Sequence, residues 1–293
     1  MHTVILGLLL LAILGFLSPI VQDRMRAGLQ ARPALLFAVP AALTLLFCGL
    51  ATANGAFSVS LALLILAYTC APSLAAFAQG ARLVKRPSWL DFAIILMLWL
   101  PLEFSAGAQL IPKPAQGFLH SVAYGIAILL ALAIFLGFRV LPGMGYRVPA
   151  ARDLIYGVAG FLVTAPVLIV VGRLLDFIPP FHLPAHASAG RIGLTFLVIF
   201  AGTALPEEIL FRSLIQNWLM QRYGFTTRML LVSGFIFGCA HLDNGPQPLP
   251  NWRYMILATI AGIAYGKVFQ KSSSVFSSVT FHALVDATKH VFF

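Results

Sequence analysis

The chain has 293 residues, of which 60% are hydrophobic and only 10% are charged. Soluble domains carry about 25% charged residues, so this composition excludes an ordinary soluble protein and indicates a polytopic membrane protein. The net charge of +10 arises because only 9 acidic residues stand against 19 basic ones. The positive charge therefore comes from few acidic residues rather than from many basic ones, which does not indicate binding to nucleic acid. We expect the lipid bilayer to be a partner and expect no nucleic acid.

Apolar segments long enough to cross a bilayer recur along the whole chain. The first lacks a basic start and a small-residue cleavage site, so we expect a retained helix rather than a cleaved signal peptide. The fold class predicted is an all-α polytopic membrane bundle with about eight to ten transmembrane helices. The expected segments are about 4–21, 33–53, 57–79, 89–111, 117–141, 153–178, 191–220, 229–241, 252–269 and 275–290.

Basic residues gather in alternate connections between these segments. By the positive-inside rule, both termini face away from the cytoplasm, unless the short eighth segment is re-entrant and changes the parity. The residues counted are Arg24, Arg26 and Arg32; Arg82, Lys85 and Arg86; Arg139, Arg147 and Arg152; Arg222 and Arg228; and Lys267 and Lys271.

The cysteines show no pattern that carries chemistry. Cys48, Cys70 and Cys239 all lie in apolar segments and have no metal-ligand spacing. We expect them to be buried and unreactive, with no disulfide framework.

The seventh segment contains a charged cluster, Pro-Glu-Glu-Ile-Leu-Phe-Arg, at 206–212. One charge at the centre of a membrane helix costs roughly 2.5–3.5 kcal/mol, so three within six positions indicate a polar interior and a functional site. Glu208 and Arg212 are four apart and can pair, whereas Glu207 points about 100° away and is a candidate general base. Pro206 lacks an N–H group and invites a kink. The alternative is a purely structural ion pair between helices.

Two further segments carry polar residues inside apolar sequence. His241 ends the eighth segment, while His282 and Asp286 lie four apart in the tenth, so that one can orient the other. Helical rise from the nearest basic residues places Glu207 about 22 Å, His241 about 20 Å and His282 about 16 Å into the membrane. Such a group could bind a cation, relay protons or activate water. The alternative for each histidine is a structural hydrogen bond to a neighbouring helix.

Together, Glu207-Glu208-x-x-x-Arg212, Phe237-x-x-x-His241 and His282-x-x-x-Asp286 resemble the three motifs of the CPBP family, the CAAX-processing and bacteriocin-processing intramembrane proteases. The resemblance covers roughly residues 191–293. It implies a protease core at 151–293, preceded at 1–150 by transmembrane helices whose role it does not assign. It also implies a multi-pass protein of a cell membrane or endomembrane, with its active site reached from the cytoplasmic half.

The resemblance also implies roles for six residues. Glu207 with His241 would activate the attacking water, His282 with Asp286 would support the oxyanion, and Glu208 with Arg212 would hold the site together. Asp286 stands where prenyl-protein processing members have Asn, and because an ionised carboxylate repels an oxyanion, we expect it to orient His282. The substrate implied is a membrane-anchored or lipidated protein or peptide, prenylated substrates included.

The expected glutamate-type mechanism needs no cofactor, and the sequence has no His-Glu-x-x-His zinc motif. A zinc-dependent alternative stays open, with Glu207, His241, His282 and Asp286 as ligands. His182 and His186 also have a nominal metal spacing, but we expect a solvated loop there.

A different class of function uses the same kind of residues. Buried acids and histidines also mark ion pathways, so a proton- or ion-coupled transporter is the alternative. The absence of inverted repeats in the sequence argues against it.

Overall fold

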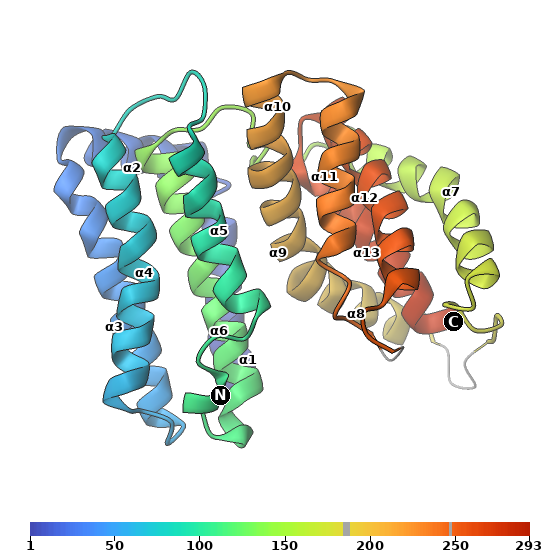
Figure 1. The fold of residues 1–293 in the computed structure, drawn as a ribbon, viewed down its shortest axis with the longest axis horizontal. Helices are drawn as coiled ribbons and strands as arrows, with labels where there is room; N and C mark the ends of the chain where they lie inside the picture. The colour runs from blue at the N-terminus through green and yellow to red at the C-terminus, as the bar shows by residue number, and fades with distance from the viewer. Residues whose placement is uncertain (184–187, 246–247) are drawn as a thin grey trace. The chain divides into compact units, whose positions relative to one another are not determined.

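The computed structural model describes residues 1–183, 188–245 and 248–293. Within these ranges the chain is all-helical and contains no strand, as predicted. Contacts divide it into two compact units, Met1–Pro142 and Gly143–Phe293 (Figure 1).

The first unit is a bundle held together partly by polar contacts. Arg139, expected in a cytoplasmic connection, is instead buried, and its Nε donates to Asp91 Oδ1 over 2.9 Å. Its Nη1 also donates to the carbonyls of Gln79 and Gly80. The elements of this unit are α1 (His2–Gly15), α2 (Pro19–Ala31), η1 (Pro33–Phe37), α3 (Ala38–Ala53), α4 (Val59–Gln79), α5 (Trp89–Glu103), η2 (Ala108–Leu110), α6 (Lys113–Leu132) and η3 (Ala133–Phe138).

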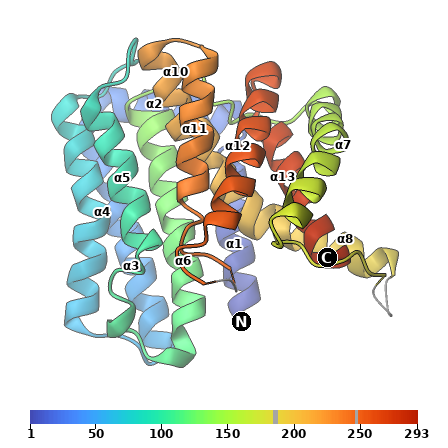
Figure 2. The same cartoon turned by 45° about the vertical axis from the view of Figure 1, so that its right-hand side comes forward.

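The second unit contains all of the predicted site residues. Its helices α11, α12, α13 and α7 follow one another across the unit in Figure 2. The elements are α7 (Ala151–Leu174), α8 (Ala189–Ile199), η4 (Phe200–Ala204), α9 (Leu205–Glu208), η5 (Ile209–Gln216), α10 (Asn217–Tyr223), α11 (Thr227–Cys239), α12 (Trp252–Ser272) and α13 (Val275–Phe292).

Each of the ten predicted segments falls on a helix, but fewer helices qualify as full membrane spans. Among the described residues, five helices are long and apolar enough to cross a membrane, or six if α1 and α2 form one span bent by 78°. That bend arises where Pro19 begins a new helix. Helix α11 has only 13 residues, and α12 and α13 carry more polar residues than an apolar span. The protein is thus a polytopic helical membrane protein.

The helix that carries the acid cluster is continuous from Ala189 to Tyr223. It contains two π-helical stretches, η4 and η5, which flank the four residues of α9. Pro206 lies at the start of α9, where it cannot donate the hydrogen bond of a regular turn. The expected kink therefore appears as a change of helical pitch, and π turns of this kind often mark functional sites.

Small residues let α11 and α12 approach each other closely. The sequences Gly234-x-x-x-Gly238 in α11 and Gly262-x-x-x-Gly266 in α12 face this contact, and a Cβ atom added at Gly238 would collide with the side chain of Thr259. Such small-x-x-x-small pairs are typical of tightly packed membrane helices. The close contact brings the last turn of α11 against the aromatic side chains of α12.

The cysteines form no disulfide, but one expectation about them is wrong. Cys48, Cys70 and Cys239 are free and half-buried rather than fully buried. Each is small enough to share an apolar helix surface with larger neighbours, which leaves it partly uncovered.

Candidate active site

Glu208 and Arg212 form the ion pair that their spacing predicts. Arg212 Nε donates to Glu208 Oε2 over 2.9 Å, and both side chains are fully buried, with 0% of either exposed. The guanidinium carbon lies 4.8 Å from the centre of the Phe237 ring and 5.8 Å from that of Tyr265. Its Nη1 and Nη2 form no hydrogen bond with any described residue. The two aromatic faces therefore supply part of the stabilisation that the missing hydrogen bonds would give.

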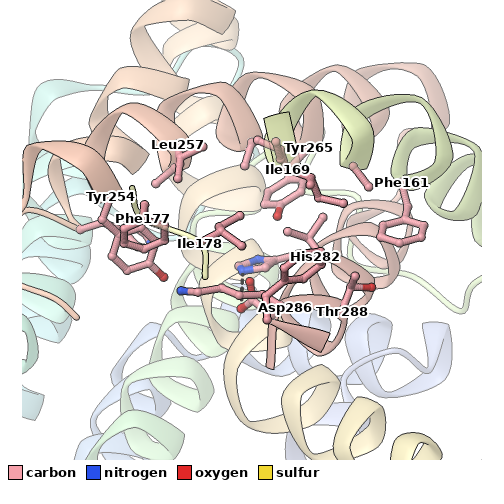
Figure 3. Close-up of a pocket in the computed structure, with 18 of the residues that line it drawn as sticks. Phe161, Ile169, Phe177, Ile178, Tyr254, Leu257, Tyr265, His282, Asp286 and Thr288 are labelled. Atoms are coloured by element: carbon pink, nitrogen blue, oxygen red, sulfur yellow. Dashed lines mark ion pairs between the residues drawn. The ribbon is translucent and has the colours of Figure 1, made fainter. Parts of the chain in front are cut away.

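His282 connects this ion pair to Asp286. Its Nδ1 lies 3.0 Å from Glu208 Oε1, and its Nε2 lies 3.3 Å from Asp286 Oδ2, an interaction drawn as a dashed line in Figure 3. An ionised carboxylate can only accept hydrogen bonds. Both ring nitrogens therefore donate, and the His282 ring carries a positive charge when both carboxylates are ionised.

Glu207 approaches the same ring from α9, but in a different environment. Its Oε2 lies 3.9 Å from His282 Nε2, and 31% of its side chain is exposed, against 0% for Glu208. The two neighbouring acids therefore differ as their helical positions predict, because Glu208 is fully buried in its pair with Arg212 whereas Glu207 is partly exposed.

His241 lies two residues beyond the end of α11. Its Nδ1 is 2.8 Å from the carbonyl oxygen of Phe237. Because a carbonyl oxygen only accepts, the proton is on Nδ1, and in the neutral ring Nε2 keeps its lone pair. Its ring also packs edge-to-face against Tyr254, with 4.6 Å between the ring centres. His241 is thus oriented with one nitrogen able to accept a proton.

Aromatic rings from α11 and α12 hold both imidazoles. The Phe237 ring centre is 4.7 Å from that of His241 and 5.8 Å from that of His282. Tyr265 stacks on His282 with ring centres 4.7 Å apart and planes inclined by 19°. This packing covers faces of both rings with aromatic surface and lowers the local dielectric constant, which strengthens the charged hydrogen bonds.

A small cavity of about 70 Å³ lies beside these residues within the second unit. Its walls come from α7, the last turn of α11, α12 and α13, and include His241, His282 and Asp286 together with many apolar side chains (Figure 3). About 10–15 Å³ of such space is enough to hold one water molecule, so the cavity has room for several waters. Two imidazoles and a carboxylate therefore face a space in which water can be held.

The structure brings the six residues singled out in the sequence into one neighbourhood. Glu207, Glu208, Arg212, His282 and Asp286 are linked by successive contacts of 2.9 to 3.9 Å. His241 joins them through the Phe237 ring and the shared cavity. Their catalytic roles stay predictions.

The arrangement does not fit a zinc ion. Zinc needs nitrogen lone pairs, but both nitrogens of His282 face carboxylates, and Nδ1 of His241 faces a carbonyl. Among the described residues, no group of three or more His, Cys, Asp or Glu side chains could hold a metal ion. We therefore assign no catalytic role to zinc. That the reaction is independent of metal stays a prediction. His186, the second member of the other histidine pair, lies outside the described residues.

The sequence analysis missed several residues of this site. Tyr254 and Tyr265 are eleven residues apart, which is three helical turns, so their common face on α12 was a usable signal. Gln216 follows Glu208 and Arg212 at the same spacing of four, and its Nε2 donates to the Gly266 carbonyl of α12 over 3.0 Å. Lys289 also lines the cavity, and its position one turn after Asp286 could have indicated this.

Residues 190–288 match the family model for Rce1-like proteins, described as type II CAAX prenyl endopeptidase Rce1-like. No curated protein and no solved structure matches the chain. The matched range includes all six predicted site residues and agrees with the extent of the resemblance. The family supports an intramembrane protease activity, and the apolar helices support an integral membrane protein. Residues 190–288 thus form an Rce1-like domain, in agreement with the resemblance of this part of the chain to the CPBP family of CAAX proteases.

Proposed function

We propose that the protein is an intramembrane endopeptidase in which a glutamate activates water to hydrolyse a peptide bond. The observation that supports this most is the environment of His282. Both of its nitrogens face carboxylates, so the ring is built to carry positive charge rather than to accept a proton. The base must then be another group, and Glu207 and His241 are the candidates beside it.

Water activation is assigned to Glu207 and His241. Glu207 is partly exposed, and an ionised carboxylate in this position can accept a proton from water. His241 keeps a lone pair on Nε2 in its neutral form and faces the cavity. A water held between these groups has an acceptor for its proton and is oriented for attack.

Stabilisation of the oxyanion is assigned to His282. When the water oxygen attacks the carbonyl carbon, the carbonyl oxygen becomes negative, and a cationic donor in a dry site stabilises it strongly. Asp286 lies 3.3 Å from Nε2 of His282 and orients the ring before substrate binds, and the oxyanion then replaces this carboxylate as the acceptor of the Nε2–H group. Loss of one such donor in other enzymes slows the reaction by about 10²- to 10³-fold.

The second half of the reaction returns the proton. Collapse of the tetrahedral intermediate breaks the C–N bond, and the proton taken from water passes to the leaving nitrogen, so that the products are a carboxylic acid and an amine. Glu208 and Arg212 act as positioning residues, because Glu208 accepts from His282 and is itself fixed by Arg212.

The proposed substrate is a membrane-anchored or lipidated protein or peptide, with a prenylated chain as the first candidate. The description of the matching family, which names prenyl endopeptidases, supports this choice. The apolar walls of the cavity also suit a segment that arrives from lipid. We propose that the substrate enters from the cytoplasmic half of the membrane.

The test is cleavage by purified protein reconstituted in liposomes, with membrane-anchored peptides that are either prenylated or unmodified. The proposal predicts cleavage that survives a zinc chelator. Loss of cleavage on chelation, restored by zinc, would replace the glutamate mechanism with a metal-dependent one. Proton or ion flux without cleavage of any peptide would favour the transporter alternative.

A further inference from the structure

Helix α2 runs across one end of the bundle formed by the first unit. It is bent by 78° from α1. Arg26 Nε donates to the carbonyl oxygen of Leu136 over 2.9 Å, and Gln30 Nε2 donates to that of Phe138 over 3.0 Å. Both carbonyls belong to η3 at the end of α6, and the last carbonyl groups of a helix have no partner within it. These hydrogen bonds therefore fix α2 against the end of the bundle.

The connection between α4 and α5, residues 80–88, reaches the same point. The backbone N–H group of Arg82 donates to the Phe138 oxygen over 3.1 Å, so Arg82 and Gln30 share one acceptor. Figures 1 and 2 both show α2 and this connection at the same end of the bundle. Residues 19–32 and 80–88 thus lie side by side and form one surface, which we call the basic surface.

The charges of the basic surface are almost all positive. Its exposed cations are Arg24, Arg32, Arg82, Lys85 and Arg86. Its one acid, Asp23, lies 3.3 Å from the partly buried Arg26. Hydrogen bonds and ion pairs with described residues are absent for the side chains of Arg24, Arg32, Arg82 and Lys85. The surface therefore presents positive charge that the described part of the chain does not neutralise.

Exposed apolar side chains accompany these cations. Ile20 on α2 and Leu83 in the connection are 64% and 66% exposed, and Trp89, the first residue of α5, is 58% exposed. Basic residues beside exposed apolar ones are typical of segments that lie in the plane of the membrane interface, and Trp is enriched at that level. The basic surface is therefore suited to the headgroup region, where apolar side chains can enter the boundary with the acyl chains.

The composition of α2 also keeps this helix out of the hydrocarbon core. Charged side chains are costly in hydrocarbon unless they face a polar interior. The polar residues among the 13 of this helix are Gln22, Asp23, Arg24, Arg26 and Gln30. A position across the end of the bundle lets Arg24 and Asp23 remain in contact with water and headgroups.

The chemistry of the cations favours phosphate as their partner. Three of the four that have no partner among the described residues are arginines, and a guanidinium binds phosphate oxygens through two parallel hydrogen bonds. A zwitterionic headgroup also brings a positive group, which this surface repels, whereas an anionic headgroup does not. The positive-inside rule predicts that this end faces the cytoplasm, where anionic lipids attract basic segments next to membrane helices.

We propose that the basic surface binds the headgroups of anionic phospholipids, with Arg24, Arg32, Arg82 and Lys85 as the ligands of their phosphate groups. This inference goes beyond the proposed function and does not depend on it, because all four residues lie in the first unit, outside the Rce1-like domain. The bound lipids hold α2 at the level of the headgroups and so fix how deeply the first unit sits in the membrane.

The test measures which lipids stay bound to the purified protein. The protein is taken from mixed micelles with equal amounts of phosphatidylglycerol and phosphatidylcholine that have identical acyl chains, and the retained lipids are counted by native mass spectrometry. One cation near an anionic lipid favours binding by about fivefold. Because several cations act together, we expect phosphatidylglycerol to be retained over phosphatidylcholine by about tenfold or more. Added salt should reduce this preference, since it screens exposed charges.

Substitutions separate the basic surface from the net charge of the protein. The preference should fall to about one in a four-site variant that carries Arg24→Gln, Arg32→Gln, Arg82→Gln and Lys85→Gln. Most of it should persist in a control variant that loses the same number of exposed cations elsewhere, Lys113→Gln, Arg228→Gln, Lys267→Gln and Lys271→Gln. Replacement of the three arginines of the surface by lysine keeps the charge and should retain most of the preference.

The four-site variant should remain folded, because its altered side chains have no partner among the described residues. Thermal unfolding in phosphatidylcholine alone checks this. If the variant unfolds early, Arg24→Gln with Arg32→Gln on α2 and Arg82→Gln with Lys85→Gln in the connection are measured as separate pairs. Each pair should lower the preference by about threefold or more.

Three results would overturn the inference. The first is equal retention of the two lipids by the wild type, and the second is an unchanged preference in the four-site variant or in both pairs. The third is an equal loss in the control variant, which would assign the preference to net charge. Peptide cleavage enters none of these measurements, so a failure of this inference is distinguished from a failure of the proposed function.

Discussion

Nδ1 of His282 lies 3.0 Å from Oε1 of Glu208, although 74 residues separate the two along the chain. This contact joins α13 to the helix that carries the acid cluster. It makes the buried pair of Glu208 and Arg212 part of the support for His282 rather than an isolated structural feature. The stability of the core and the orientation of the proposed oxyanion donor therefore depend on the same atoms.

Removal of Arg212 should destabilise the fold. Arg212→Ala leaves the carboxylate of Glu208 buried without its main partner, and breaking such a pair typically costs about 3–5 kcal/mol. The double variant Glu208→Gln with Arg212→Met should lose less, because it leaves no buried charge from this pair. Thermal or denaturant unfolding of the purified protein in detergent measures both. Wild-type stability in Arg212→Ala would show that the pair does not support the fold.

Asp286 should be replaceable by asparagine. The amide oxygen in Asp286→Asn can still accept from Nε2 of His282, so we expect kcat/KM within about tenfold of the wild type. Asp286→Ala removes the acceptor and should lower kcat/KM by about 10²-fold. Cleavage rates of the two variants provide the comparison. Equal loss in both would mean that the negative charge of Asp286, and not its hydrogen bond, is required.

His241 should matter for chemistry and little for stability. Among the described residues, its side chain forms one hydrogen bond, to the Phe237 carbonyl of the last turn of α11, so His241→Gln should unfold near the wild-type temperature. If it assists the proton transfer, the cleavage rate should fall by about 10²- to 10⁴-fold. The exposed His290→Gln on α13 is the matched control and should keep full activity. An active His241→Gln would remove this residue from the mechanism.

The close contact of α11 and α12 gives a prediction about packing. Gly238→Ala places a methyl group against Thr259 and should destabilise the protein by about 1–3 kcal/mol. Gly193→Ala is the control, because its added Cβ meets no atom within 4 Å and should be neutral or stabilising by up to about 1 kcal/mol. Unfolding curves of the two variants test this. Equal effects would mean that the helices can separate without cost.

The sequence revealed those contacts of the site that form between residues of a single helix. The pairs Glu208 with Arg212 and His282 with Asp286 follow from a separation of four residues, and both are present. The contact between Glu208 and His282 could not be predicted in the same way. It depends on how α13 packs against the acid helix, and no local pattern encodes that.

The structure differs from the fold predicted from the sequence at places where apolar periodicity carries no information. The run at 4–21 reads as one span, but Pro19 starts a second helix at 78° to the first. The π-helical stretches on either side of α9 were not predicted, because they are local changes of pitch, over five and eight residues, that hydropathy does not register. The sequence also gives no sign of the aromatic rings around the ammonium of Lys289, because Phe177 and Tyr254 come from other parts of the chain.

The most direct test of the central claim is the cleavage rate of Glu207→Gln in liposomes, normalised to folded protein. Glutamine has the same shape but cannot accept a proton from water at neutral pH. We predict unfolding at the wild-type temperature together with a loss of cleavage of about 10²-fold or more. Cleavage at the wild-type rate would contradict the account, because the water would then be activated by a different group.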